Sequence, residues 1–206
     1  MKLGYLIVAA GLLMTVSACS KAPTSPAADA EAAKTTVSAP PVPAGDTRTI
    51  KDLMDSLIDP SGDFLFESVQ EIANDKGITK KQPRTDAEWA LVAHHFTVLQ
   101  QASDLLIMEG RRSARPEDKP EHPEVENPPE EVQKLMDAER PEFIRRAKAL
   151  QAVAGDGLKA VEAKDVAALS ATLLAMDKAC ESCHLHFWYP NDKRAHQAAK
   201  EEGVPE

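Results

Sequence analysis

The stretch Cys180-Glu181-Ser182-Cys183-His184 decides the fold of this 206-residue chain. Two residues separate its cysteines, and the histidine follows the second cysteine directly. On a helix, Cys180 and His184 lie one turn apart, so a thiol and an imidazole share the same face. Two thiols and an imidazole so close together predict a site for a cofactor or a metal.

This pentapeptide is the attachment signature of a c-type haem. Each thiol adds to one haem vinyl group and becomes a thioether, and the adjacent histidine offers its imidazole to the iron. Two other interpretations stay open, because a CxxC pair is also found in redox dithiols and as one half of a zinc site. A dithiol does not need the histidine, and the third cysteine of the chain, Cys19, provides no second pair for zinc.

Residues 1–18 have the features of a secretory signal, with the charge of Lys2 before an apolar segment. That segment, Leu3 to Val16, is too short for a comfortable membrane span. It ends in Val16-Ser17-Ala18-Cys19, which resembles the lipobox of bacterial lipoproteins. The alternative is ordinary signal cleavage next to an incidental cysteine.

The lipobox resemblance implies cleavage before Cys19 and acyl chains on Cys19 that anchor the protein to a membrane. By analogy with known lipoproteins, Ser20 in the next position favours the outer membrane, on its periplasmic side. Export fits the haem signature, because bacteria attach c-type haem outside the cytoplasm. Residues 19–46 are rich in Ala, Pro, Ser and Thr and predict a disordered tether.

The composition and the absence of certain motifs in the sequence argue against some classes of partner and activity. The formal net charge of −9 argues against nucleic acid as a partner and would attract a basic redox protein. The sequence has no paired catalytic carboxylates, no serine–histidine constellation and no glycine-rich phosphate loop, so we expect a protein that is not an enzyme.

Apolar residues at three- and four-residue spacing predict four helices within residues 47–190. We expect the first to begin near Thr47 or Thr49, to be interrupted at Asp59-Pro60 and to continue to Asn74. The second starts at a capping box formed by Thr85 and Glu88. Its outer face carries Leu91, Val98 and Leu105, which predict either a homodimer interface or packing against a loop.

Residues 111–131 alternate prolines with acids and predict a solvated loop. The third helix begins near Pro129 or Pro141 and ends at about Ala163; Gly155 and Gly157 would let the haem or a neighbouring helix approach it closely. The fourth starts at an N-cap, Asp165, carries both haem cysteines and stops before Pro190. We expect residues 191–206 to be a loose polar tail.

Four amphipathic helices with CxxCH near the end of the last resemble the class II c-type cytochromes, the group of cytochrome c′ and cytochrome c556. The resemblance covers about residues 48–190. It implies an all-α, antiparallel four-helix bundle with one covalently attached haem near the end of the last helix. Cys180 and Cys183 would form the thioethers, and His184 would be the proximal iron ligand. Many members have an arginine four residues after that histidine, where this chain has Trp188.

The far side of the iron separates the two branches of this family. In the c556-like branch a methionine from the first helix binds there, and the candidate is Met54, on the apolar face with Ile50 and Leu57. In the cytochrome c′ branch the distal side is apolar and open to NO or CO. Met54 as a packed core residue is the alternative, and His95 is a weaker candidate for the distal ligand.

The leading hypothesis is an extracytoplasmic, membrane-tethered cytochrome with one haem, which carries single electrons between redox partner proteins. Histidine–methionine ligation would raise the reduction potential and suit that role. The alternative is a gas-binding protein of cytochrome c′ type. A third hypothesis is a haem-free CxxC protein acting in thiol exchange or metal binding.

Overall fold

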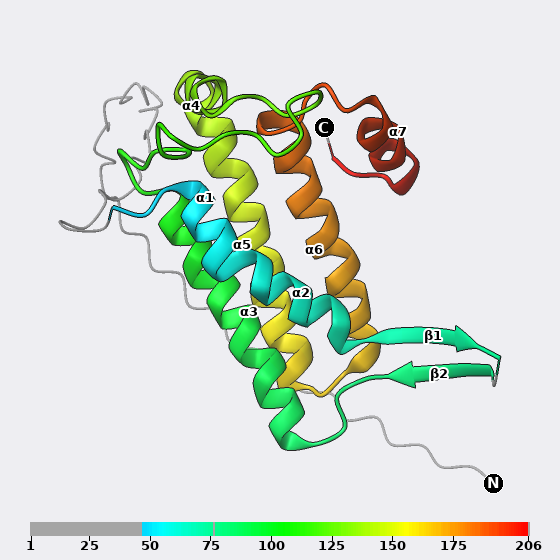
Figure 1. Cartoon of the computed structure of the whole chain (residues 1–206). Helices are drawn as coiled ribbons and strands as arrows, with labels where there is room; N and C mark the ends of the chain where they lie inside the picture. Colours follow the sequence, from blue (N-terminus) through cyan, green and yellow to red (C-terminus); the bar gives the residue numbers. More distant parts are fainter. Residues whose placement is uncertain (1–46, 76, 206) are drawn as a thin grey trace, which may run out of the picture. The chain divides into compact units, whose positions relative to one another are not determined.

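The structure, a computed structural model, describes residues 47–75 and 77–205. This part of the chain is mostly helical (Figure 1). The expected signal peptide, the lipidation site at Cys19 and the tether lie outside the described residues. In chain order, the elements are α1 (Ile50–Leu53), η1 (Met54–Ile58), α2 (Asp59–Ser68), β1 (Gln70–Asn74), β2 (Gly77–Lys81), α3 (Asp86–Leu106), α4 (Pro129–Ala138), α5 (Arg140–Glu162), α6 (Val166–Phe187) and α7 (Lys193–Glu202).

The first three elements form one continuous stretch, which we call the first helical segment (Ile50–Ser68). Its start is a capping box: the Thr49 hydroxyl accepts from the Asp52 amide, and the Thr49 amide donates to the Asp52 carboxylate. The expected interruption at Asp59-Pro60 is a change of hydrogen-bonding register, because the π-helical turn η1 precedes Pro60 without a break in the helix.

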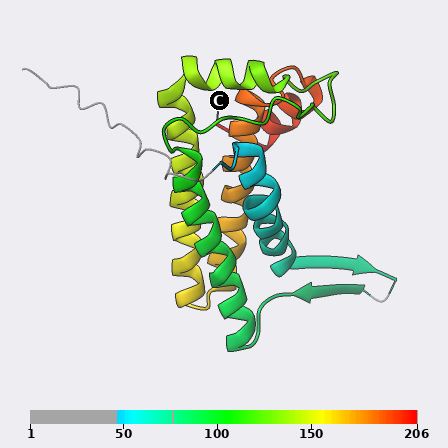
Figure 2. The ribbon, with the colours of Figure 1, turned by 60° about the vertical axis from the view of Figure 1, so that its left-hand side comes forward.

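The prediction that this helix continues to Asn74 is wrong. Val69 is extended, and β1 pairs antiparallel with β2 so that Ile72 lies opposite Thr79. Apolar residues at positions 65, 69 and 72 fit a helical face, but Ile72 is 45% exposed and reaches no core. Its β-branched side chain suits a strand. The hairpin extends away from the helices in both views (Figures 1 and 2).

The three long helices α3, α5 and α6 lie side by side, with α5 packed against both of the others and α2 packed against α3. The capping box of Thr85 and Glu88 and the N-cap Asp165 are both confirmed. Gly157 lets helix α5 approach α3, because a Cβ at this position would overlap the ring of Phe96. The core between these helices is apolar, with Phe96, Leu99, Ala154, Leu169 and Met176 almost fully buried.

Each of the two prolines considered for the start of the third helix lies in the first turn of its own helix, Pro129 in α4 and Pro141 in α5. The connection from Ile107 to Pro128 contains no helix. The expectation of a loose C-terminal tail is wrong: Asp192 caps α7, Ala199 is buried, and Gly203 ends the helix with φ +72°. Within the described residues, no helix combines the length and the apolar character needed to cross a membrane.

Candidate cofactor site

The motif Cys180–His184 lies in the last two turns of α6. The amides of Trp188 and Tyr189 both donate to the His184 carbonyl, at 2.7 and 3.0 Å, and end the helix there. Cys180 and Cys183 are half-buried, and neither is in a disulfide. Helical geometry therefore places the thiols and the imidazole on adjacent turns, as the sequence predicts.

Two cavities lie between the first helical segment and α6, with volumes of about 220 and 240 Å³. Four residues line both of them: Met54 and Asp59 from the first helical segment, and Cys183 and His184 from α6. Cys180 lines the second cavity but not the first. The structure thus brings Met54, the candidate distal ligand, to the same cavities as the Cys180–His184 motif.

Most of the remaining lining is apolar. In the first cavity it comes from helices α1, α4 and α5 and from the end of α6: Ile50, Val132, Met136, Phe143, Phe187 and Trp188. In the second it comes mainly from α3, α5 and α6: Leu99, Leu106, Ala147, Leu150, Met176 and Ala179. Concave, mainly apolar sites with a few polar groups are typical for organic ligands and cofactors.

Burial sets the protonation of the motif. It raises the pKa of the Cys180 thiol and of the Cys183 thiol from 9.0 to about 12, so the thiolate form of both is suppressed further. A dithiol that exchanges rapidly needs the opposite, a lowered thiol pKa. Burial also lowers the pKa of His184. A neutral imidazole is the form that binds a metal.

Side chains and loops fix the end of α6. The Tyr189 hydroxyl donates to the Glu181 carboxylate at 2.7 Å. The side-chain amide of Asn127 donates to the Phe187 carbonyl, and its backbone N–H donates to the Trp188 carbonyl. These contacts hold the segment that follows His184 in one position.

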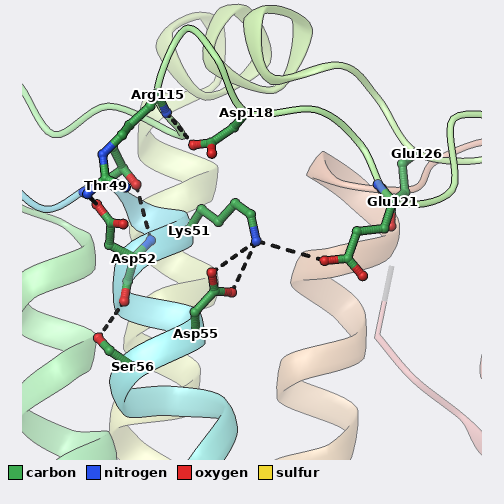
Figure 3. Close-up of polar contacts among 9 residues, drawn as sticks. All are labelled: Thr49, Lys51, Asp52, Asp55, Ser56, Arg115, Asp118, Glu121 and Glu126. Atoms are coloured by element: carbon green, nitrogen blue, oxygen red, sulfur yellow. Dashed lines mark hydrogen bonds and ion pairs between the residues drawn. The ribbon is translucent and has the colours of Figure 1, made fainter.

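Several charged residues line the first cavity, among them Lys51, Asp55 and Glu121, whose contacts are drawn in Figure 3. Lys51 lies 3.0 Å from Asp55 on its own helical segment and 4.0 Å from Glu121 on the loop before α4. A second ion pair, Arg115 with Asp52 at 2.9 Å, joins the same loop to α1. Two ion pairs therefore join this loop to the first helical segment, and both residues of the pair with Lys51 line the first cavity.

The other sequence candidates lie elsewhere. His95 is absent from the lining of both cavities; its Nδ1 is 3.2 Å from the Ser61 hydroxyl, and its ring stacks on Phe64. On the outer face of α3, Leu91 is 50% exposed, whereas Val98 and Leu105 are half-buried. Whether that face binds a second copy stays a prediction.

Sequence reasoning missed Asp59 and Arg146 as cavity residues. Asp59 has the character of a helix cap in the sequence, and nothing local shows that it lines the site. Arg146 could have been found, because it follows Phe143 by three residues and precedes Leu150 by four, which places it on the core face of α5.

No family model, no curated protein and no solved structure matches this chain. Among residues 47–75 and 77–205, no three His, Cys, Asp or Glu side chains are grouped so that they could hold a bare metal ion.

Proposed function

We propose that this chain binds one haem c covalently and carries single electrons outside the cytoplasm. The observation that carries the proposal is the shared lining of the two cavities: Met54 comes from one wall, and Cys183 and His184 come from the other. Two thiols can form the thioethers of a haem c, and an imidazole and a methionine thioether are axial ligands that such a haem can take. The apolar residues in both linings suit the face of a porphyrin.

The residues of the chain have separate tasks in this proposal. Cys180 and Cys183 would hold the macrocycle through thioethers, and His184 would be the proximal ligand. Met54 stands at the start of η1, and π-helical turns of this kind are frequent at functional sites. When bound, a haem supplies reversible one-electron chemistry, and histidine–methionine ligation raises its reduction potential.

We infer an antiparallel four-helix bundle composed of the first helical segment, α3, α5 and α6. The packing of α2 on α3, of α3 on α5 and of α5 on α6 supports this inference. The remaining side of the bundle, between the first helical segment and α6, is where both cavities lie. A macrocycle on that side would complete the core.

The test replaces Met54 by leucine in the exported protein and compares visible spectra, oxidised and reduced, with and without CO. If Met54 binds the iron, the wild type gives sharp α and β bands that CO does not change, and Met54→Leu gives a spectrum that responds to CO. The matched control is Met136→Leu, because Met136 is a buried methionine in the lining of the first cavity.

Identical spectra for the wild type and Met54→Leu would exclude Met54 as the ligand. A wild type that already responds to CO would favour the gas-binding alternative, with an open distal side. Leucine for methionine conserves volume, so the change costs under about 1.5 kcal/mol of folding free energy and leaves the cavity wall in place.

A further inference from the structure

A buried cation lies beside the haem motif. Arg146, on α5, is only 4% exposed and lines the second cavity together with Cys180, Cys183 and His184. Removing a guanidinium from water is costly unless its charge is paired and its N–H groups are bonded. Its partners therefore show what holds it there.

The guanidinium donates directly to the motif. Its Nη1 donates to the carbonyl of Ser182, between the two cysteines, at 2.6 Å. Inside a helix this carbonyl also accepts from the amide four residues on, and its second lone pair is open to Arg146. A charge-assisted hydrogen bond of this length is about twice as strong as a neutral one.

A second contact reaches the turn after the motif. Nη2 of Arg146 is 3.5 Å from Nδ1 of His186, while Nε2 of His186 is 2.7 Å from the Glu139 carboxylate. A guanidinium donates and never accepts, so Nδ1 is the acceptor and Nε2 carries the proton donated to Glu139. Arg146 thus joins α5 to α6 at two successive turns.

The counter-charge is Glu142, one turn earlier on α5. Its Oε1 is 2.7 Å from Nε of Arg146; the contact is an ion pair without hydrogen-bond alignment, since that Nε has no hydrogen-bond partner. Glu142 also binds Arg145, which is 54% exposed. One carboxylate therefore serves two arginines, one inside the protein and one at its surface.

We propose that Arg146 is a positioning residue that fixes the Cys180–His184 turn and whose buried charge raises the reduction potential of an iron bound there. The proposal rests on the proposed function. A ferric site carries one more positive charge than a ferrous site, so a buried cation nearby favours the reduced form. The negative charge of Glu142 would lower the reduction potential, but its side chain is more exposed than that of Arg146.

The test is the midpoint potential of the full-length exported protein, titrated spectroscopically. Arg146→Met removes the charge, and we expect a lower potential; Glu142→Gln leaves Arg146 without its counter-charge, and we expect a higher one. Arg146→Lys keeps the charge and should stay closer to the wild type than Arg146→Met. The matched control, Arg145→Gln, removes a cation from the same carboxylate at the surface and should shift the potential least.

If Arg146 had only a structural role, the potentials of Arg146→Met and Glu142→Gln would move in the same direction or both stay unchanged. Either result would overturn the claim that the charge of Arg146 raises the reduction potential. If Arg146→Met does not fold, the sign of the shift in Glu142→Gln decides the same question. A fall in its potential contradicts the proposal.

Amide hydrogen exchange tests the positioning part without use of the haem. We expect amides 182–187 to lose protection in Arg146→Met and to keep it in Arg145→Gln; unchanged protection in Arg146→Met would overturn this part. A wild-type chain without haem overturns the proposed function and the effect on the potential together, whereas the exchange experiment still decides whether Arg146 holds the turn.

Discussion

At the scale of single residues, surroundings more than residue type decide what the titratable groups do. Burial disfavours the charged form of the Cys180 and Cys183 thiols and raises the pKa of both to about 12. Glu142 shows the opposite effect: the hydrogen bond from Arg145 is the main cause that lowers its pKa to about 2, and the charge of Arg146 adds to it.

The lowered pKa of Glu142 predicts how the unfolding free energy changes at acid pH. Its pKa in the folded chain lies below the ordinary value of 4.5, so its contribution is fully present above about pH 4.5 and is lost as the pH falls towards about 2. We expect Glu142→Gln to flatten the fall in unfolding free energy across this window. Urea unfolding monitored by circular dichroism measures this free energy across the pH window.

The control for this prediction is Glu130→Gln, which removes an exposed carboxylate from α4. If the control and Glu142→Gln lose the same amount of pH dependence, the two arginines do not stabilise the Glu142 carboxylate in the folded state.

The two glycines of α5 predict opposite effects of the same substitution. A Cβ at Gly157 would overlap the Phe96 ring, so Gly157→Ala should lower the unfolding free energy by about 1–3 kcal/mol. At Gly155 the new Cβ would be 3.5 Å from the Gln100 amide nitrogen, an ordinary contact. Gly155→Ala should therefore stabilise the helix by about 0.5–1 kcal/mol. Thermal unfolding of both variants compares them, and equal effects would contradict the packing of Phe96 on Gly157.

Sequence could place the motif residues but not their neighbours. Cys180, Cys183 and His184 lie within one stretch of helix, so the helical period alone brings them together. Asp59 and Arg146 are far from the motif in sequence and reach it through the packing of the first helical segment and α5 around α6. Met54 is intermediate: its apolar face was predictable, and its presence at both cavities required the fold.

At the scale of elements, local capping signals were reliable and apolar spacing was not always so. Thr85, Glu88 and Asp165 make the caps that their residue types predict, because a cap depends on a few adjacent residues. Residues Gln70–Asn74 form a strand, because a short apolar pattern does not by itself distinguish a helix from a strand.

The hairpin of β1 and β2 should add little to stability. Nearly all of its residues are exposed, and its ion pair between Lys80 and Glu71 is at the surface. Since Gln70 lies opposite Lys81, a short Gly-Ser linker can replace residues 70–81. We expect the unfolding free energy to change by less than about 1 kcal/mol. A loss of several kcal/mol would show that the hairpin packs on the helices.

At the scale of the whole molecule, both cavities lie where the first helical segment faces α6. The loop before α4 lines only the first of them, and ion pairs with Lys51 and Asp52 join this loop to the first helical segment (Figure 3). The loop and the lining of the first cavity carry several acids, which would attract the basic redox partner expected from the net charge. Leu91, on α3, is 50% exposed and is part of the lining of neither cavity.

The proposed lipid anchor predicts where the protein is found. Cys19→Ala removes the acceptor of the acyl chains, so we expect the protein to move from the membrane fraction to the soluble periplasmic fraction. Its visible spectrum should not change, because Cys19 is not one of the residues that would hold the haem in the proposed function. Immunoblots of fractionated cells measure the distribution, and an unchanged membrane fraction would contradict lipidation at Cys19.

Covalent haem is the claim on which the other functional proposals depend, and intact mass tests it most directly. The exported chain is produced in a host competent in c-type maturation, denatured and extracted to remove haem that is not covalently bound. Its intact mass is then measured and compared with that of the double variant Cys180→Ala/Cys183→Ala. We predict that the wild-type chain keeps the added mass of one haem and that the double variant does not. A colourless wild-type chain with no added mass, in which both thiols react with an alkylating reagent, would contradict it.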